Sequence, residues 1–348
     1  MKRNEKIKIL SRLGVITNEL AHKRDWKGSE LGLNEGEYND LLKLIEKVNI
    51  YNTWFTPDSV RQALLGISKW LNEDALRSWL KDYELDQQKP KRVALIMAGN
   101  IPLVGFHDFL SVYLSGNRPV IKLSSEDKHL FPALLKTLAL FDNTIIDSVE
   151  IYEEKIGEFE AVIATGSNNS ATYFESYFGS YPNIIRKNRK SIAILDGNET
   201  DDELRELGND IFTFYGLGCR NVTQIWIPEN YNLDRFFEAI YDFNAVIHHN
   251  KYANNYDYNK AVNLMNQEEI LDNGFLLLKE DLTIHSPLGM LHYVRYTDEK
   301  SVCDFINQNK DEIQAVVGKK YLSFGQAQRP ELSDYADGVD TMKFLTEL

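Results

Sequence analysis

The chain has 348 residues, of which 43% are hydrophobic and 26% are charged, and its formal net charge is −13. This is the composition of a globular protein long enough for two domains, and it excludes disordered, collagen-like and repeat architectures. The acidic balance argues against general binding to nucleic acid or to anionic membranes, because both need a basic surface.

Two cysteines are too few for a disulfide framework, which favours a reducing compartment. No apolar run approaches the roughly 18–20 residues of a membrane span. The basic N-terminus lacks an apolar stretch of signal-peptide length. We therefore expect a cytoplasmic protein without a membrane span.

Residues 1–90 are predicted to be helical, because apolar residues recur at helical spacing from Ile9 to Leu20, from Leu41 to Val48 and from Val60 to Ile67. We expect these amphipathic helices to pack on another part of the chain. The polar stretch 86–92 marks a break between these helices and the first expected strand.

From residue 91, apolar runs of strand length alternate with helical segments. Strands are expected in RVALIMAGN, PVIKLSS, SVEIY, FEAVIATGS and RKSIAILDG, with the helices HDFLSVYLSGN, HLFPALLKTLALF and SATYFESYF between them. This α/β alternation predicts βαβ units and a parallel sheet covered on both faces. After the helix DDELRELGNDIFTFYG it continues less regularly, which predicts domains over 91–190 and 191–325 and a tail over 326–348.

Cys219 lies in the glycine-rich run YGLGCRNVTQ, at a helix-to-strand junction. A thiolate forms near neutral pH only with nearby charge or backbone dipoles, and the adjacent Arg220 offers charge. A buried structural cysteine is the commoner fate of a free thiol, so the spacing leaves both roles open. Cys303 falls on the apolar period of a helix and is expected in the core.

Asn100, in AGNIPLVGF, follows the carboxyl end of an expected parallel strand, where α/β proteins bind ligands. Its side-chain amide has the chemistry to donate a hydrogen bond to a developing oxyanion. A turn asparagine that caps the next helix accounts for the pattern equally well.

Two other strand ends carry polar residues. VIKLSSED places Lys122, Ser124 and Ser125 at one of them, and IATGSNNSA places Gly166 and Ser167 at the start of a helix. A glycine–serine turn that leads into a helix N-terminus is typical of a phosphate site, although the GxGxxG fingerprint is absent.

The basic cluster RKNRK at 186–190 is interpreted as a solvated helix end, with a phosphate site for a cofactor or coenzyme A as the alternative. His248 and His249 are adjacent, but no carboxylate or cysteine with ligand spacing accompanies them, so we expect no metal. His285 stands alone and fits either the core or a site.

Taken together and in this order, the motifs resemble the aldehyde dehydrogenase superfamily. Within it, AGNIPLVGFHDFLSVYLSGN, IRKNRKSIAILDGNET, FYGLGCRNVTQIW and FGQAQRPELSDYADGVDT resemble the LuxC-type acyl-CoA reductases, over about residues 90–345. The resemblance implies two Rossmann-like parallel-sheet domains, the first binding NADP and carrying the helical N-terminal segment, the second carrying the nucleophile. It implies roles for Cys219 as nucleophile, Asn100 as oxyanion donor, Lys122 at the cofactor ribose and Gly166–Ser167 at the pyrophosphate.

The chain departs from this pattern where classical aldehyde dehydrogenases carry a glutamate base, since it reads Ile194-Leu195-Asp196-Gly197 there. That base activates water to hydrolyse an enzyme thioester, so its absence fits acyl exchange with a thiol. Glu199, His249 and His285 remain open as alternative acid–base residues.

Ser125 stands where the superfamily carries a carboxylate toward the adenosine ribose. A hydroxyl accommodates a 2′-phosphate that a carboxylate would repel, so NADPH is predicted over NADH. Glu126 and Asp127 come next in the chain and are expected to face solvent as the first residues of the next helix.

The resemblance implies NADPH-dependent reduction of a fatty acyl-CoA, or another acyl thioester, to the aldehyde through an acyl-enzyme on Cys219. The alternatives are a cysteine acyltransferase or thioesterase without a hydride step, a short-chain CoA-acylating aldehyde dehydrogenase, and a nucleotide-binding subunit without activity. A homo-oligomer and an acyl-protein synthetase partner are also implied. These motifs do not specify the acyl chain length.

Overall fold

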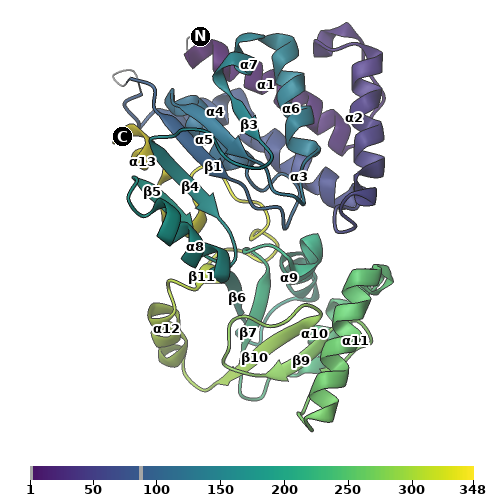
Figure 1. The fold of residues 1–348 in the computed structure, drawn as a ribbon. Coiled ribbons are helices and arrows are strands. Elements are labelled where there is room, and N and C mark those ends of the chain that lie inside the picture. Colours follow the sequence, from purple (N-terminus) through teal and green to yellow (C-terminus); the bar gives the residue numbers. More distant parts are fainter. Residues whose placement is uncertain (1–2, 86–88) are drawn as a thin grey trace. The chain divides into compact units, whose positions relative to one another are not determined.

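The computed structural model describes residues 3–85 and 89–348 of the protein (Figure 1). The chain divides into two compact units, Met1–Lys187 with Glu331–Leu348 as unit 1 and Asn188–Pro330 as unit 2. Of the polar break expected before the first strand, residues 86–88 lie outside the described part of the chain.

Unit 1 begins with the helical segment that the apolar spacing predicts. Its helices are α1 (Arg3–Ala21), α2 (Glu35–Lys47), α3 (Pro57–Trp70) and α4 (Glu73–Leu80), with 3-10 turns at Ser29–Leu31 and Val48–Ile50. The last three α-helices start where the side chains of Asn34, Thr56 and Asn72 accept backbone N–H groups of the first turn.

A parallel five-stranded sheet forms the centre of unit 1, in the order β3-β2-β1-β4-β5. Its strands are β1 (Arg92–Ile96), β2 (Arg118–Lys122), β3 (Glu150–Tyr152), β4 (Ala161–Thr165) and β5 (Asn183–Arg186). The chain runs outward from β1 to β3 and then crosses to β4 on the other side of β1. Such a reversal of strand order opens a crevice at the carboxyl ends of the strands.

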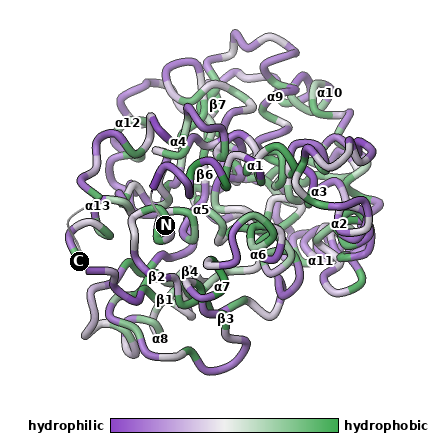
Figure 2. Tube along the Cα trace, turned by 90° about the horizontal axis from the view of Figure 1, so that it is seen from above, coloured by the Kyte–Doolittle hydropathy of each residue, from purple (hydrophilic) through white to green (hydrophobic). Residues whose placement is uncertain are grey.

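Both faces of this sheet are covered, as the alternation predicts. Val93 and Leu95 of β1 join the core beneath α5 (Phe106–Ser115), α6 (Leu130–Phe141) and the N-terminal helices, whereas Ala94 packs toward α8 (Asn168–Phe178). The short helix α7 (Thr144–Ser148) precedes β3. α6 is hydrophobic along most of its length (Figure 2).

The C-terminal residues belong to unit 1. Met342 and Leu345 of α13 (Thr341–Thr346) are fully buried, after a 3-10 turn at Ala336–Gly338. The Trp79 indole donates a hydrogen bond to the Tyr335 hydroxyl at 2.7 Å, and the Asn117 amide donates to the Leu345 carbonyl at 3.1 Å.

Unit 2 holds a six-stranded sheet in the order β11-β6-β7-β10-β9-β8, parallel except for the β8–β9 pair. Its strands are β6 (Lys190–Ile194), β7 (Val222–Pro228), β8 (Leu271–Asp272), β9 (Leu277–Glu280), β10 (Met290–Tyr296) and β11 (Ile313–Val317). Its helices are α9 (Asp201–Phe212), α10 (Leu233–Ala239), α11 (Asn250–Met265) and α12 (Glu299–Gln308), with 3-10 segments at Thr213–Gly216 and Tyr241–His248. The expected α/β class with two parallel-containing sheets is confirmed.

The expectation that Cys303 lies in the core is wrong. Val302, Phe305 and Ile306 of α12 face the sheet at helical spacing, and Cys303 is exposed one position beyond that face.

Among the described residues, no helix has the length and apolar character needed to cross a membrane.

Candidate active site

Cys219 lies on a tight turn between α9 and the amino end of β7, and its side chain is partly exposed. The turn starts with three consecutive residues in the left-handed region, Phe214 (φ 53°), Tyr215 (φ 57°) and Gly216 (φ 82°). Non-glycine residues rarely adopt this conformation and hold it only when surrounding contacts impose it. The backbone of this turn is therefore strained, and the hydrogen bonds described next hold it in this conformation.

Asn221 ties this turn to the end of α9. Its Oδ1 accepts a hydrogen bond from the Gly218 N–H at 2.7 Å. Its Nδ2 donates to three carbonyl oxygens, those of Asp210 (3.1 Å), Ile211 (3.1 Å) and Thr213 (2.8 Å). Because the side chain is fully buried, these bonds satisfy backbone groups that water cannot reach.

The neighbouring strand β6 supplies a second set of bonds. The Lys190 ammonium donates to the carbonyl oxygens of Gly216 (3.1 Å) and Gly218 (3.2 Å). The Ser191 hydroxyl donates to the Cys219 carbonyl at 3.3 Å. Burial lowers the pKa of Lys190, whereas the charge of Cys219 acts to raise it. The sequence groups Lys190 with a basic cluster and gives no sign of this role.

Asp210 extends the support beneath the turn. Its carboxylate accepts hydrogen bonds from the backbone N–H groups of Gly325 (2.7 Å) and Ala327 (2.9 Å). Burial raises the pKa of Asp210 to about 7 despite these donors. These bonds connect the segment 324–328 to the C-terminal end of α9, to which Asn221 is also hydrogen-bonded.

Three residues are candidates for the acid–base group, and the structure describes each. Glu199 is buried, and its carboxylate accepts the backbone N–H groups of Asp196 (2.5 Å) and Gly197 (3.2 Å). Burial raises the pKa of Glu199, and these backbone donors oppose the rise. This bonding makes Glu199 part of a turn after β6.

The two histidines lie near the Cys219 turn within unit 2. The His249 ring is 4.5 Å from the Tyr215 ring, and its Nδ1 accepts the Tyr252 N–H at 3.4 Å. His285 lies 3.6 Å from the Glu312 carboxylate. Burial lowers the pKa of His285; Glu312 raises it and Lys190 lowers it further. Within residues 3–85 and 89–348, no group of His, Cys, Asp or Glu side chains could hold a metal ion.

In unit 1, Asn100 is exposed on the loop after β1. The Leu103 N–H in this loop donates to the Asp127 carboxylate at 2.9 Å, and Leu103 has a left-handed φ of 58°. The expectation that Asp127 faces solvent is wrong, because Asp127 is 7% exposed and α6 begins only at Leu130. Burial raises the pKa of Asp127.

The loops after β1 and β2 are in close contact. A Cβ atom built on Gly99 would lie 2.8 Å from the Cβ atoms of Ser124 and Glu126. The Ser124 hydroxyl accepts the Glu126 N–H at 3.2 Å, and Ser125 is exposed. The Lys122 ammonium, at the end of β2, donates to the Glu153 carbonyl at 3.3 Å.

The β4 end completes this edge of the unit 1 sheet. Ser167 caps α8, its hydroxyl accepting the Ser170 N–H at 3.2 Å. A Cβ on Gly166 would lie 2.8 Å from the Ser170 Cβ, so glycine permits the tight strand-to-helix turn. Lys122, the serine pair and this helix start lie at the carboxyl ends of β2 and β4, on either side of β1. Open α/β sheets bind their ligands at this edge, and a helix start of this kind suits a phosphate group.

The basic cluster 186–190 is not a helix end. Arg186 closes β5, where it is buried and forms an ion pair with Asp108 at 2.5 Å and a hydrogen bond to Thr341 at 2.9 Å. Lys187 pairs with Glu175 at 3.0 Å, and Lys190 opens β6. The cluster consists of two strand ends and the link between them, because the apolar residues 184–185 make the preceding segment a strand.

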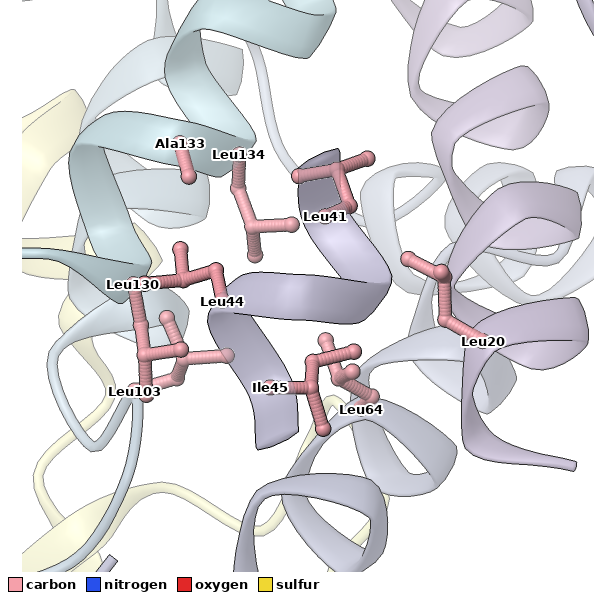
Figure 3. A pocket seen from close by; sticks show the side chains of 9 residues that line it. All are labelled: Leu20, Leu41, Leu44, Ile45, Leu64, Leu103, Leu130, Ala133 and Leu134. Carbon is pink, nitrogen blue, oxygen red and sulfur yellow. The ribbon is translucent and has the colours of Figure 1, made fainter. Parts of the chain in front are cut away.

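Unit 1 also contains an apolar pocket, whose lining side chains from four helices and the Asn100 loop point toward one space (Figure 3). The lining residues are Leu20, Leu41, Leu44, Ile45, Leu64, Leu103, Leu130, Ala133 and Leu134. Its volume of about 10 Å³ is close to the minimum that one water needs. At this size it is a packing gap behind the Asn100 loop and has no room for an acyl chain.

Comparisons with known proteins agree on a family and a fold. A family described as acyl-CoA reductase (LuxC) matches residues 34–323. The long-chain acyl-protein thioester reductase of Photorhabdus laumondii is 23% identical over 279 residues, which are 71% of this chain and 56% of that protein. The chain thus spans about half the length of this curated relative.

Solved aldehyde dehydrogenases share the fold. Aldehyde dehydrogenase 21 from Physcomitrella patens has a TM-score of 0.65 at 12% identity, covering 100% of this chain and 84% of that one. NADP-dependent glyceraldehyde-3-phosphate dehydrogenase from Bacillus halodurans, solved with NADP, has a TM-score of 0.59 at 12% identity, covering 91% and 74%. The fold is therefore aldehyde-dehydrogenase-like, as the motifs predict.

Proposed function

The chain belongs to the acyl-CoA reductase (LuxC) family, and we propose that it reduces a fatty acyl thioester to the aldehyde with NADPH, through an acyl-enzyme on Cys219. The observation that carries this proposal is the family match over residues 34–323, which includes both the Asn100 loop and the Cys219 turn. The name of the Photorhabdus relative supports an acyl thioester as the substrate class, carried by coenzyme A or by a protein.

Cys219 is the proposed nucleophile. Its thiolate attacks the carbonyl carbon of the acyl thioester, the bond from that carbon to the carrier sulfur breaks, and the carrier leaves as a thiol after taking up a proton. The acyl group stays on Cys219 as a new thioester. The hydrogen-bonded turn and the intermediate exposure of Cys219 support this role, because the backbone is held while the residue is not fully buried.

The proposed oxyanion donors are the side-chain amide of Asn100 and the backbone N–H of Cys219. Donors of this kind stabilise the charge that develops on the carbonyl oxygen. Asn100 lies in unit 1 and Cys219 in unit 2, so their joint role rests on the resemblance of both motifs to the superfamily.

NADPH, when bound, supplies the hydride that reduces the acyl-enzyme. Lys122, Ser124 and Ser125 are the residues proposed to hold its ribose and 2′-phosphate, and Gly166 with Ser167 its pyrophosphate. The NADP-bound neighbour of the same fold supports a nicotinamide dinucleotide as the cofactor class. When the aldehyde departs, the bond to sulfur breaks and Cys219 is released as the thiolate.

Hydrolysis of the acyl-enzyme would release the acyl group as an acid without reduction, and the residues at the end of β6 do not favour it. Ile194, the last residue of β6, stands where the superfamily's motif carries its glutamate base. The Glu199 carboxylate is occupied by two backbone donors. A homo-oligomer and an acyl-protein synthetase partner belong to the same proposal and rest on the resemblance alone.

The test combines purified protein, NADPH and a series of acyl-CoA chain lengths, and follows both NADPH consumption and thiol release. We expect the two to proceed together, with Cys219→Ala reducing both to background. Asn100→Ala should lower kcat by about 10²-fold or more. Thiol release without NADPH consumption would identify an acyltransferase or thioesterase instead, and unchanged activity in Cys219→Ala would end the proposal.

A further inference from the structure

Lys190 carries a partly buried positive charge at the back of the Cys219 turn. Its ammonium donates to the Gly216 and Gly218 carbonyls, and none of its hydrogen-bond or ion-pair partners among the described residues is a carboxylate. The titratable groups that face it are Cys219 and His285, with Glu312 beside His285. Partial burial of a cation without a carboxylate partner costs free energy, so Lys190 is a candidate for a functional role.

The bond to Gly218 fixes the direction of the next N–H group. The described chain contains no cis peptide, so the Gly218 carbonyl and the Cys219 N–H lie in one peptide plane and point in opposite directions. With that carbonyl held by Lys190 at 3.2 Å and by the Asn221 N–H at 3.3 Å, the Cys219 N–H is directed away from Lys190.

Three more bonds prevent this peptide from turning over. Asn221 Oδ1 accepts the Gly218 N–H, Lys190 holds the Gly216 carbonyl, and the Ser191 hydroxyl holds the Cys219 carbonyl. A flip of the Gly218–Cys219 peptide would bring its N–H against the ammonium and remove the carbonyl from it. The orientation is therefore tied to the charge on Lys190.

The same charge acts on the sulfur. An ammonium close to a thiol in a partly desolvated turn favours the thiolate over the neutral form, and the Lys190 ammonium is bonded to the carbonyl of Gly218, the residue before Cys219. The interaction is mutual, since the charge of Cys219 counteracts the effect of burial on the pKa of Lys190.

We propose that Lys190 is a positioning residue of the Cys219 turn. The Lys190 ammonium directs the Cys219 N–H toward the developing oxyanion and stabilises the Cys219 thiolate. This inference rests on the proposed function of Cys219. It adds a residue on β6 that acts through the backbone of the turn and through charge.

The first test measures the thiolate directly and needs no substrate. The chain has two cysteines, so Cys303→Ser, at an exposed position of α12, leaves Cys219 as the only thiol. In that background, the rate of alkylation by iodoacetamide is measured as a function of pH for the protein with Lys190 intact and for Lys190→Met, Lys190→Gln and Lys190→Arg. We expect the inflection point of the pH–rate profile to rise by about one pH unit or more in the Met and Gln variants. In the Arg variant it should return toward the value measured with Lys190.

The second test separates rate from affinity with acyl-CoA and NADPH. Lys190→Met should lower kcat by about 10²-fold with little change in KM for NADPH. Lys190→Gln keeps a donor to the Gly218 carbonyl and should lose less. Lys279→Met is the control, because Lys279 is a partly buried lysine of the same sheet whose partners are Glu268 and Asp281.

The outcomes distinguish this inference from the proposed function. If Lys190→Gln and Lys279→Met both retain the original alkylation profile, the inference is wrong even when the wild type reduces acyl-CoA. If the wild type consumes no NADPH with any acyl-CoA, the proposed function fails, while the alkylation series still decides the thiolate effect. Should Lys190→Met not fold, the Gln and Arg variants carry the test.

Discussion

Asp210 is the residue whose protonation most directly affects the support beneath the Cys219 turn. Burial raises its pKa from 3.8 to about 7, so the folded protein holds this proton more tightly than the unfolded chain does. Its contribution to stability is therefore fully present below pH 3.8 and is lost as the pH rises through about 7.

We compare the unfolding free energy of the wild type with that of Asp210→Asn. The difference, wild type minus variant, should fall by up to about 4 kcal/mol between acidic pH and pH 8, because one pKa unit corresponds to about 1.4 kcal/mol. Denaturant titrations across this range measure it, with the exposed Asp304→Asn on α12 as the control for loss of one charge. An advantage that stays constant or grows with pH would contradict this account.

Ser125 is the residue proposed to decide between the two nicotinamide cofactors. Ser125→Glu adds a carboxylate that repels a 2′-phosphate, so the ratio of kcat/KM for NADPH over NADH should fall by about tenfold or more. Ser125→Ala removes the hydroxyl without adding charge and should change the ratio less. An unchanged ratio in Ser125→Glu shows that the cofactor ribose binds elsewhere.

At the scale of elements, the contact between the loops after β1 and β2 depends on the missing side chain of Gly99. Gly99→Ala would place a methyl 2.8 Å from the Cβ atoms of Ser124 and Glu126, where overpacking costs about 1–3 kcal/mol. We expect lower stability together with weaker NADPH binding, because the Asn100 loop and the serine pair must separate.

The matched control is Gly66→Ala on α3, where an added Cβ meets nothing within 4 Å. Alanine favours a helix over glycine by about 1 kcal/mol, so this variant should be as stable as the wild type or more so. If Gly99→Ala behaves like Gly66→Ala in denaturant and in NADPH titration, the loop contact has no such importance.

Most regular elements could be predicted from apolar spacing, because each packs a continuous apolar surface onto one core. The α5 helix ends before Gly116, which has a φ of 92°, and β1, β2, β4 and β6 fall in the expected apolar runs. The pattern does not mark β5, a four-residue edge strand whose polar ends look like a turn.

The errors at single residues have a common physical cause. Asp127 is buried with a hydrogen bond from the Leu103 N–H, and Arg186 is buried with the Asp108 carboxylate as its ion-pair partner. Both partners are distant in the sequence. The role of Lys190 likewise depends on carbonyls that lie 26 and 28 positions later in the chain. Local composition carries no information about such partners.

At the scale of the whole chain, the C-terminal segment returns to unit 1. The Arg186 guanidinium connects β5 to Asp108 of α5 and to Thr341 of α13. Removing one partner of a buried ion pair typically costs about 3–5 kcal/mol. The segment 331–348 is thus part of the structure that bears the proposed cofactor residues, which its polar sequence alone does not indicate.

The most direct test of the acyl-enzyme is the intact mass of the protein after incubation with a long-chain acyl-CoA. Without NADPH we expect a single added acyl group, retained in Cys303→Ser, absent in Cys219→Ala, and lost with release of aldehyde when NADPH is supplied. Aldehyde formation by Cys219→Ala, or an acyl group located on Cys303, would contradict the mechanism.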